Sequence, residues 1–447
     1  MADMKRPAHP APEATAPVGA AGSVRPAGLQ PSRTVLDNGL AILVKEARTM
    51  PAVTINLAVR AGSACDPADS VGLAYFVSKT IDRGTERRSV DELAEELDGR
   101  GVSLSVNVTR HLLTISCTCL VDDFEAVLGL VGEIAMAPSF PPSEVETRRG
   151  EMVTAIRQDQ DNPGVVAVEQ LMATLYPNGH PYGRPAKGTV EGVGQLTRGD
   201  LARFHARWCA PGNAVLVAVG DVEAARMTDA ASRVFAGWRG AADPAPMVAE
   251  PAPLTRRTRR VRPMMNKAQA DIAYGFTTIA RRDPAYDAYW LMNNILGQYA
   301  MGGRLGESIR ERQGMAYYVF SSFDANVVAG PLFVRAGVNP ANVDRAIESI
   351  DREMTAMAGK GVTDRELAES KQFLIGSMPR QLETNTGIAS FLQMVEYFGL
   401  GLDYDVRLPE LLRAVTRDEV DAAARRTLDA DRAAVVIAGP YQDDGKP

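Results

Sequence analysis

Residues 196–220, LTRGDLARFHARWCAPGNAVLVAVG, match residues 415–439, VTRDEVDAAARRTLDADRAAVVIAG, without a gap. The offset between the two segments is 415 − 196 = 219 residues. In both copies, a segment with helical periodicity leads to an apolar run of strand length that ends at a glycine. Similar segments at a fixed offset indicate an internal repeat, so we expect a duplicated fold.

A second match, nearer the start of each half, supports the duplication. Ala74-Tyr75-Phe76 corresponds to Ala288-Tyr289-Trp290, with an offset of 289 − 75 = 214 residues. The two halves have similar lengths, and each mixes strand-like with helical patterns. The sequence therefore predicts an α+β fold made of two duplicated domains.

Two local signals in the first half fix the ends of elements. Asn38-Gly39 stands between two apolar runs, a pattern typical of a β-hairpin because both residues tolerate positive φ. Ser89 and Glu92 have the spacing of a capping box, which predicts a helix that begins there and ends near Gly99.

The composition excludes several classes of protein. A chain of 447 residues with 45% hydrophobic and 23% charged residues is an ordinary globular chain of two to four domains. Lys and Arg number 49 against 55 Asp and Glu, and this net charge of -6 argues against a dedicated binder of nucleic acid or anionic membranes. No apolar run approaches the roughly 20 residues of a membrane span. Four cysteines do not indicate a disulfide framework, and Cys117 and Cys119 are expected as buried small hydrophobic side chains.

Proline-rich stretches suggest where the domains begin and end. Residues 1–32 form a Pro/Ala-rich tail that we expect to be disordered, and residues 241–258 form an extended linker. The domains are then 33–240 and 259–441, with a short tail at 442–447. Five arginines at or after the linker could contact phosphate, but a solvated strand face is the better interpretation in an acidic chain; they are Arg256, Arg257, Arg259, Arg260 and Arg262.

The segment Gly72-Leu-Ala-Tyr-Phe-Val-Ser-Lys-Thr-Ile-Asp-Arg-Gly-Thr85 resembles the zinc-helix segment of the pitrilysin/insulinase family, the inverzincins. The signature of that family is H-x-x-E-H, in which two histidines one helical turn apart bind zinc and the glutamate activates the metal's water. The resemblance implies that each domain is a mixed or antiparallel sheet backed by helices.

At the matching positions this chain has Tyr75, Ser78 and Lys79. The segment from Glu146 to Pro163 resembles the family helix that supplies the last ligand, and it places Ala155 at that position, with 155 − 79 = 76 close to the family spacing. A phenol with a pKa near 10 and an ammonium group with a pKa near 10.4 are poor zinc ligands at neutral pH. We therefore expect no zinc in this chain.

No other catalytic set is visible in the sequence. None of His9, His111, His180 and His205 belongs to a recognisable metal-binding pattern, and the phosphate-loop and nucleophile-elbow motifs are absent from the sequence.

The second half keeps a different family motif. Arg310 and Tyr317, with 317 − 310 = 7, match the signature R-x6-Y within the segment Arg304 to Ser321. In isolation Arg310 would be a solvated helix residue and Tyr317 an ordinary strand residue. The resemblance implies instead that both hydrogen-bond the substrate backbone beside a zinc ion and stabilise the oxyanion that forms at the attacked carbonyl.

Two further segments carry candidate substrate contacts. Gly302 and Gly303 belong to a glycine-rich loop that resembles the substrate-binding loop of the zinc-less subunit of mitochondrial processing peptidase, although these glycines could equally serve as turns. The segment Asn178-Gly-His-Pro-Tyr-Gly-Arg-Pro185 matches a family segment, so His180 and Tyr182 are expected either to line a peptide chamber or to form a packed loop.

The resemblance extends over roughly Thr34 to Tyr441 and implies a function in a pair. We expect a zinc-less subunit, inactive alone, that forms a heterodimer with a homologous zinc-bearing partner, contributes Arg310 and Tyr317 in trans, and encloses a peptide substrate. The alternative is a structural subunit of a larger complex. No apolar signal segment is visible, which favours the cytoplasm, or the periplasm if a leader is missing from this sequence.

Overall fold

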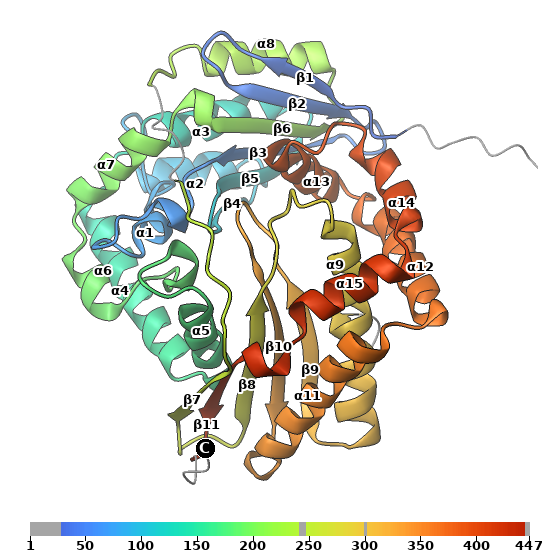
Figure 1. Cartoon of the computed structure of the whole chain (residues 1–447). Coiled ribbons are helices and arrows are strands. Elements are labelled where there is room, and N and C mark those ends of the chain that lie inside the picture. The colour runs from blue at the N-terminus through green and yellow to red at the C-terminus, as the bar shows by residue number, and fades with distance from the viewer. Residues whose placement is uncertain (1–27, 241–246, 299–301, 443–447) are drawn as a thin grey trace, which may run out of the picture.

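The computed structural model describes residues 28–240, 247–298 and 302–442. These residues form two sheets, one above the other in Figure 1, with helices around and between them. The upper sheet has the strand order β1(Ser32–Val35)-β2(Ala41–Glu46)-β6(Ala214–Gly220)-β3(Ala52–Val59)-β5(Leu113–Leu120)-β4(Leu104–Val108). The lower sheet has the order β7(Thr258–Pro263)-β11(Ala434–Gly439)-β8(Ala270–Thr277)-β10(Pro331–Val338)-β9(Ala316–Phe323).

The two sheets have the same topology once β1 is set aside. In each half the last strand is inserted between the first two: β6 lies between β2 and β3, and β11 lies between β7 and β8. That strand pairs in parallel with the first strand and antiparallel with the second, and the remaining pairs are antiparallel. The predicted duplicated α+β fold is confirmed.

The repeat seen in the sequence appears as equivalent elements. Helix α7 (Arg198–Trp208) begins at a capping box of Thr197 and Asp200, and α15 (Arg417–Thr427) begins at a capping box of Thr416 and Glu419. Each helix leads to the inserted strand of its sheet, β6 or β11. The matched tripeptides likewise lie in α1 (Leu73–Thr80) and α9 (Tyr286–Asn293).

Each half lends one helix to the sheet of the other half. Helix α5 (Pro163–Leu175) precedes the linker in the chain, yet it packs on β8 and β11 of the lower sheet. Helix α13 (Asn385–Phe398), from the second half, packs on β3 and β6 of the upper sheet. Figure 1 shows α5 beside the lower sheet and α13 against the upper one. The exchange joins both halves into one packed body.

This exchange explains why the inserted strands are apolar throughout. Every residue of β6 and of β11 is buried, because helices of the same half cover one face and the borrowed helix covers the other. A strand covered on both faces has no solvent side that could carry polar residues. Cys117 and Cys119 of β5 are buried in the core of the upper half, as expected.

The other helices surround the sheets (Figure 1). In the first half they are α2 (Val90–Asp98), α3 (Phe124–Met136), α4 (Pro142–Gln160), α6 (Val190–Gln195) and α8 (Ala224–Val234). In the second half they are α10 (Gly303–Leu305), α11 (Val343–Lys360), α12 (Asp364–Gln381) and α14 (Tyr404–Ala414), with π-helical turns η4 (Asn294–Gln298) and η5 (Gly306–Arg312).

The local signals of the first half correspond to real element ends. Strands β1 and β2 pair antiparallel around a turn in which Gly39 has a φ of 91°, so the hairpin prediction is confirmed. Ser89 accepts a hydrogen bond from the Glu92 amide and the Glu92 side chain accepts one from the Ser89 amide, which confirms the capping box.

The proline-rich segments lie only partly within the described residues. Of the expected tail, 1–32, residues 1–27 lie outside the described ranges. In the remainder, the Leu29 amide donates a hydrogen bond to Asp405 Oδ2 over 2.6 Å, and Ser32 begins β1. The first six residues of the 241–258 linker, and residues 443–447, are also outside them.

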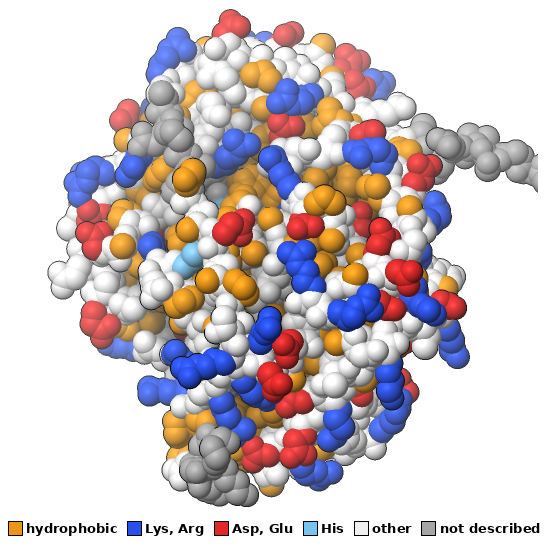
Figure 2. Space-filling view, in the orientation of Figure 1, with side chains coloured by type: hydrophobic (Ala, Val, Ile, Leu, Met, Phe, Trp, Pro, Cys, Tyr) orange, Lys and Arg blue, Asp and Glu red, His pale blue; other side chains and the backbone are white. Residues whose placement is uncertain are grey.

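The basic run after the linker forms edge strand β7 and its approach. Arg257 pairs with Asp351 and Arg259 with Asp344, whereas Arg260 and Arg262 are exposed. Figure 2 shows positive and negative side chains interspersed over this face of the molecule, which fits the solvated-strand interpretation. No helix among the described residues has the length and apolarity to cross a bilayer.

We predict that Leu171→Ala in α5 destabilises the sheet of the other half. Leu171 is fully buried and lies against Gly275 of β8, so its truncation should lower the free energy of unfolding by about 2–5 kcal/mol. Hydrogen exchange read by mass spectrometry should show faster exchange in β8 and β11, far away in the sequence. The exposed neighbour Gln170→Ala is the control, and faster exchange confined to the first half would contradict the proposed coupling.

Candidate functional site

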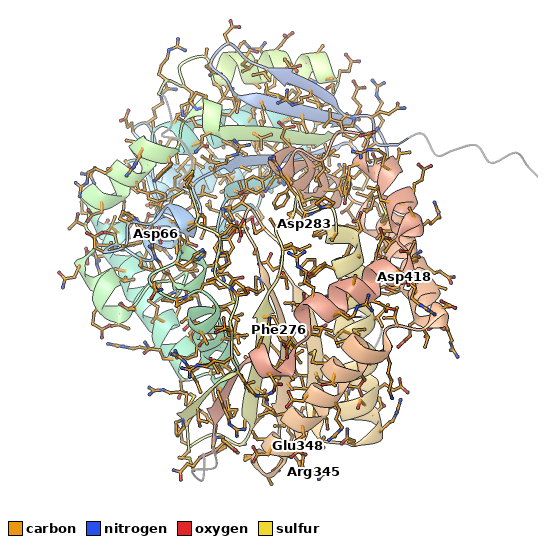
Figure 3. The ribbon with its side chains drawn as sticks, in the orientation of Figure 1. Asp66, Phe276, Asp283, Arg345, Glu348 and Asp418 are labelled. Carbon is orange, nitrogen blue, oxygen red and sulfur yellow. The ribbon has the colours of Figure 1, made fainter. Side chains whose placement is uncertain are left out.

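Helix α1, which carries Tyr75, Ser78 and Lys79, begins at a buried acidic cap. The Asp66 carboxylate accepts hydrogen bonds from the Gly72 and Ala74 amides, each over 2.8 Å, at the start of the helix. Figure 3 shows Asp66 beside α1. Burial raises the pKa of Asp66 to about 7, although both amides oppose the shift. A Cβ at Gly72 would lie 2.6 Å from the Lys187 carbonyl oxygen, so the left-handed cap requires glycine.

The side chains of Tyr75, Ser78 and Lys79 make contacts within α1 itself. Ser78 is buried and its hydroxyl donates to the Tyr75 carbonyl oxygen over 2.7 Å. The Lys79 ammonium lies 5.1 Å from the centre of the Tyr75 ring, in a cation–π contact. Ala155 is half-buried in α4, which packs against α1. The four positions thus carry a phenol, a hydroxyl, an ammonium and a methyl group.

This set of side chains does not fit a zinc ion. Zinc sites in proteins use thiolate, imidazole and carboxylate donors, and none of these is present at the four positions. The Lys79 ammonium would add a repulsive positive charge. In the three described ranges of the chain, no group of three or more His, Cys, Asp and Glu side chains is placed to hold a metal ion.

His180 and Tyr182 lie in a packed loop between the halves. Tyr182 is 1% exposed, and its ring lies edge-on to Tyr176 and to His180. The Tyr182 hydroxyl and His111 Nε2 are 2.6 Å apart, and His180 Nδ1 accepts the Tyr182 amide. This environment fits the packed-loop alternative for Tyr182. The His111 ring also lies 6.1 Å from the Tyr397 ring of α13, so the cluster joins the two halves.

Arg310 lies on the π-helical turn η5. Its Nε is 3.6 Å from Glu311 Oε1, a long contact with its own neighbour in the chain, and its side chain is 40% exposed. No other residue in the described part of the chain forms an ion pair with it. Arg310 is therefore not held in the fold by a distant carboxylate. Single π-helical turns are uncommon and are found often at functional sites.

Tyr317 lies near the start of β9, the last strand of the lower sheet. It is 66% exposed, one of the few large hydrophobic side chains on the surface. Turn η5 packs on β9, and the Gly314 amide donates to the Arg310 carbonyl oxygen, so the short segment between the two residues is compact. Both side chains are available to a molecule outside this chain.

The glycines before η5 have a structural reason. A Cβ at Gly302 would lie 2.7 Å from the Val319 carbonyl oxygen, and one at Gly303 would lie 2.3 Å from the Ile295 carbonyl oxygen. Both have positive φ, 107° and 57°. They permit the backbone at Gly302 to approach β9 and that at Gly303 to approach η4. Residues 299–301, which precede them, lie outside the described ranges.

The two candidate regions belong to opposite halves of the molecule. Helix α1 contacts α4, α7 and β4, whereas η5 contacts β9, α10 and α11. Figure 1 shows α1 on the left and β9 on the right. The buried cap Asp66 was not anticipated from the sequence, because an isolated acidic residue six positions before a glycine gives no specific signal.

Comparisons with known proteins agree on one family. Residues 41–189 match the model of insulinase (peptidase family M16), and residues 195–374 match the model of the peptidase M16 inactive domain. An uncharacterized zinc protease of Mycobacterium leprae is 26% identical over 422 residues, covering 92% of each chain. A non-peptidase homolog of Helicobacter pylori is 23% identical over 392 residues, covering 85% of this chain and 87% of its own.

A solved structure has the same fold as this chain over nearly the whole length of this chain. The peptidase M16 inactive domain from Pseudomonas fluorescens superposes with a TM-score of 0.85 at 27% identity, and the match covers 94% of this chain and 100% of that one.

We predict that the degenerate positions can be converted into a zinc site. The variant Tyr75→His, Ser78→Glu, Lys79→His, Ala155→Glu should bind about one zinc per chain, because it supplies two imidazoles and a carboxylate as ligands. Metal analysis of the variant after gel filtration measures the number of zinc ions bound per chain. The control keeps Ala155 and should bind zinc more weakly. A folded quadruple variant without zinc would show that these are not the equivalent positions.

We predict that acid weakens the His111 cluster. Burial, with help from the Arg110 guanidinium, lowers the pKa of His111 from 6.5 to about 4. Between these values the unfolded chain binds a proton that the folded chain does not, so this contribution to stability is present above pH 6.5 and is lost as the pH falls toward 4. Urea midpoints across this range measure the slope, which His111→Gln should flatten. An unchanged slope in the variant would disprove the assignment.

Proposed function

Because the chain belongs to the insulinase family, peptidase family M16, and lacks zinc donors at α1, we propose that it is the zinc-less subunit of a heterodimeric zinc peptidase. The partner is a homologous chain that carries H-x-x-E-H. This chain contributes Arg310 and Tyr317 to the partner's centre and encloses the peptide together with it. Alone, it is inactive as a peptidase.

The observation that supports the proposal is that Arg310 and Tyr317, the R-x6-Y pair, have exposed side chains with few contacts to the rest of the described chain. Tyr317 is 66% exposed on an end strand, and Arg310 has only its neighbour Glu311 as an ion-pair partner among residues 28–240, 247–298 and 302–442. A side chain kept for folding would be expected to contact the rest of the chain. Both residues also lie in the half opposite α1, a position that suits action on another subunit rather than on α1 itself.

The chemistry of the pair suits acyl transfer. When water attacks a peptide carbonyl, negative charge develops on the oxygen, and donors aimed at that oxygen lower the barrier. A guanidinium supplies a permanent charge with several N–H donors, and a phenol supplies one O–H donor. The metal of the partner would polarise the attacked group, while Arg310 and Tyr317 would hold the peptide backbone and stabilise the oxyanion.

Peptide capture is proposed at a strand edge. Strand β4 ends the upper sheet and lies against α1, and within the described ranges it pairs with β5 alone. An extended peptide could add to its open edge by main-chain hydrogen bonds, with side-chain pockets giving selectivity. Because α1 beside it lacks zinc donors, this edge would hold a peptide without cutting it. Gly302, Gly303, His180 and Tyr182 would support the chamber through their packing.

A second candidate function is that of a structural subunit. The match to a non-peptidase homolog of Helicobacter pylori favours it, since members of this family exist without peptidase activity. In that case Arg310 and Tyr317 would have no effect on any turnover. Turnover by variants of Arg310 and Tyr317 distinguishes the two functions.

We predict that Arg310→Ala and Tyr317→Phe each lower turnover by the assembled heterodimer by about 100-fold, because each removes an oxyanion donor. The assay mixes this chain with a zinc-motif family member from the same source and measures cleavage of a quenched peptide, zinc content and assembly. The exposed Arg312→Ala, in the same turn, is the matched control. Unaltered turnover in both variants with normal assembly would favour the structural subunit.

A further inference from the structure

A cavity of about 260 Å³ lies in the second half, away from α1, η5 and the strand edge β4. Residues of α9, α12, α13, α14 and the end of β9 line it. Six aromatic rings line it: Tyr286, Trp290, Phe323, Phe391, Phe398 and Tyr404. Its walls therefore suit an apolar body.

One cation is buried in the wall of this cavity. Arg281 is 9% exposed, and its guanidinium carbon lies 3.6 Å from the centre of the Tyr286 ring. It also lies 5.6 Å from the Tyr404 ring and 5.9 Å from the Phe398 ring. Nη2 donates to the Tyr404 hydroxyl over 2.7 Å. The aromatic faces hold the guanidinium in one orientation.

The charge of Arg281 is not neutralised by direct contact. No carboxylate within the described ranges forms an ion pair with it. Asp287, one residue beyond Tyr286, interacts with it through space and has one buried oxygen without a hydrogen bond, while Asp324 lies exposed at the cavity lining. A guanidinium has five N–H donors, and the bond to Tyr404 uses one. Its other N–H donors can therefore hydrogen-bond a carboxylate, which a guanidinium binds through two parallel hydrogen bonds.

We propose that this cavity binds a small organic carboxylate with a compact apolar body. The carboxylate of the ligand would hydrogen-bond the guanidinium of Arg281, and the apolar part of the ligand would lie among the aromatic side chains of the cavity. A cavity of 260 Å³ is smaller than the roughly 300–1,000 Å³ of drug-sized sites, so the ligand is smaller than these. The same chemistry occurs in a free aryl or alkyl acid and at the C-terminal residue of a peptide.

The location gives such a ligand a structural consequence. Phe391, Met394 and Phe398 of α13 line the cavity, and the same helix packs on the upper sheet. A ligand that binds only the folded chain stabilises it by RT ln(1 + [L]/Kd), so the stabilisation grows with the logarithm of the ligand concentration. Binding would therefore hold α13 in place and stabilise both halves together.

Trp290 provides a direct readout. It lines the cavity, whereas the other two tryptophans, Trp208 and Trp238, are buried in the core of the upper half. We would titrate the chain with 3-phenylpropionate and with 3-phenylpropan-1-ol, which share the body and differ in charge, and follow Trp290 fluorescence and heat of binding. The acid should bind at least about 10-fold more tightly, as expected for a charge-assisted hydrogen bond.

Two variants and a control complete the test. Arg281→Met should remove the preference for the acid and leave the alcohol unaffected, and the exposed Arg380→Met of α12 should change neither. Ser377→Leu fills the cavity while Arg281 stays intact, so it should abolish binding of both probes even if Arg281→Met does not fold. A peptide ending in phenylalanine separates the sources: tighter binding than 3-phenylpropionate assigns a peptide terminus, weaker binding a free acid.

The proposal fails if the wild-type chain binds acid and alcohol equally, or binds neither at the solubility limit. It also fails if the folded Arg281→Met variant keeps the preference for the acid, or if Ser377→Leu leaves binding unchanged.

Discussion

The reciprocal exchange of α5 and α13 is the constraint on which the rest of the structure depends. Each helix covers a sheet face that would otherwise expose apolar strands, and each comes from the other half of the chain. Polar contacts fix both positions: the Asn385 amide at the start of α13 donates to the Ala52 carbonyl oxygen, and Lys267 pairs with Asp161 just before α5. Neither half buries its own central strand on both faces without the other.

The exchange also decides where functional groups can act. It fixes the two sheets relative to each other, and with them the end strands β4 and β9. On α1, Lys79 lies over the Tyr75 ring of the same helix, whereas β9 and η5 present Tyr317 and Arg310 to the outside. The chain thus combines a helix, α1, that carries no zinc-donor side chain with an exposed pair, Arg310 and Tyr317, in the other half.

Cations on aromatic rings recur where the halves and helices meet. Arg60 lies over Tyr397, Arg110 over Tyr182, and Arg281 over Tyr286. In each case a guanidinium is taken partly out of water and stabilised by the ring face. For Arg110, burial lowers the pKa. Such contacts orient a cation while leaving N–H donors for another partner, and Arg281 does so beside its cavity.

The sequence by itself determined the duplicated α+β fold, the hairpin at Asn38-Gly39, the capping box of Ser89 and Glu92, and the absence of zinc-donor side chains at Tyr75, Ser78 and Lys79. These follow from local patterns and from side-chain chemistry, which do not depend on distant contacts. Only the tertiary structure decided the exchange of α5 and α13, the buried state of Tyr182, the exposure of Tyr317 and the aromatic cavity at Arg281. Each of these arises from residues far apart in the chain, and an amphipathic helix does not specify which of two similar sheets will cover its apolar face.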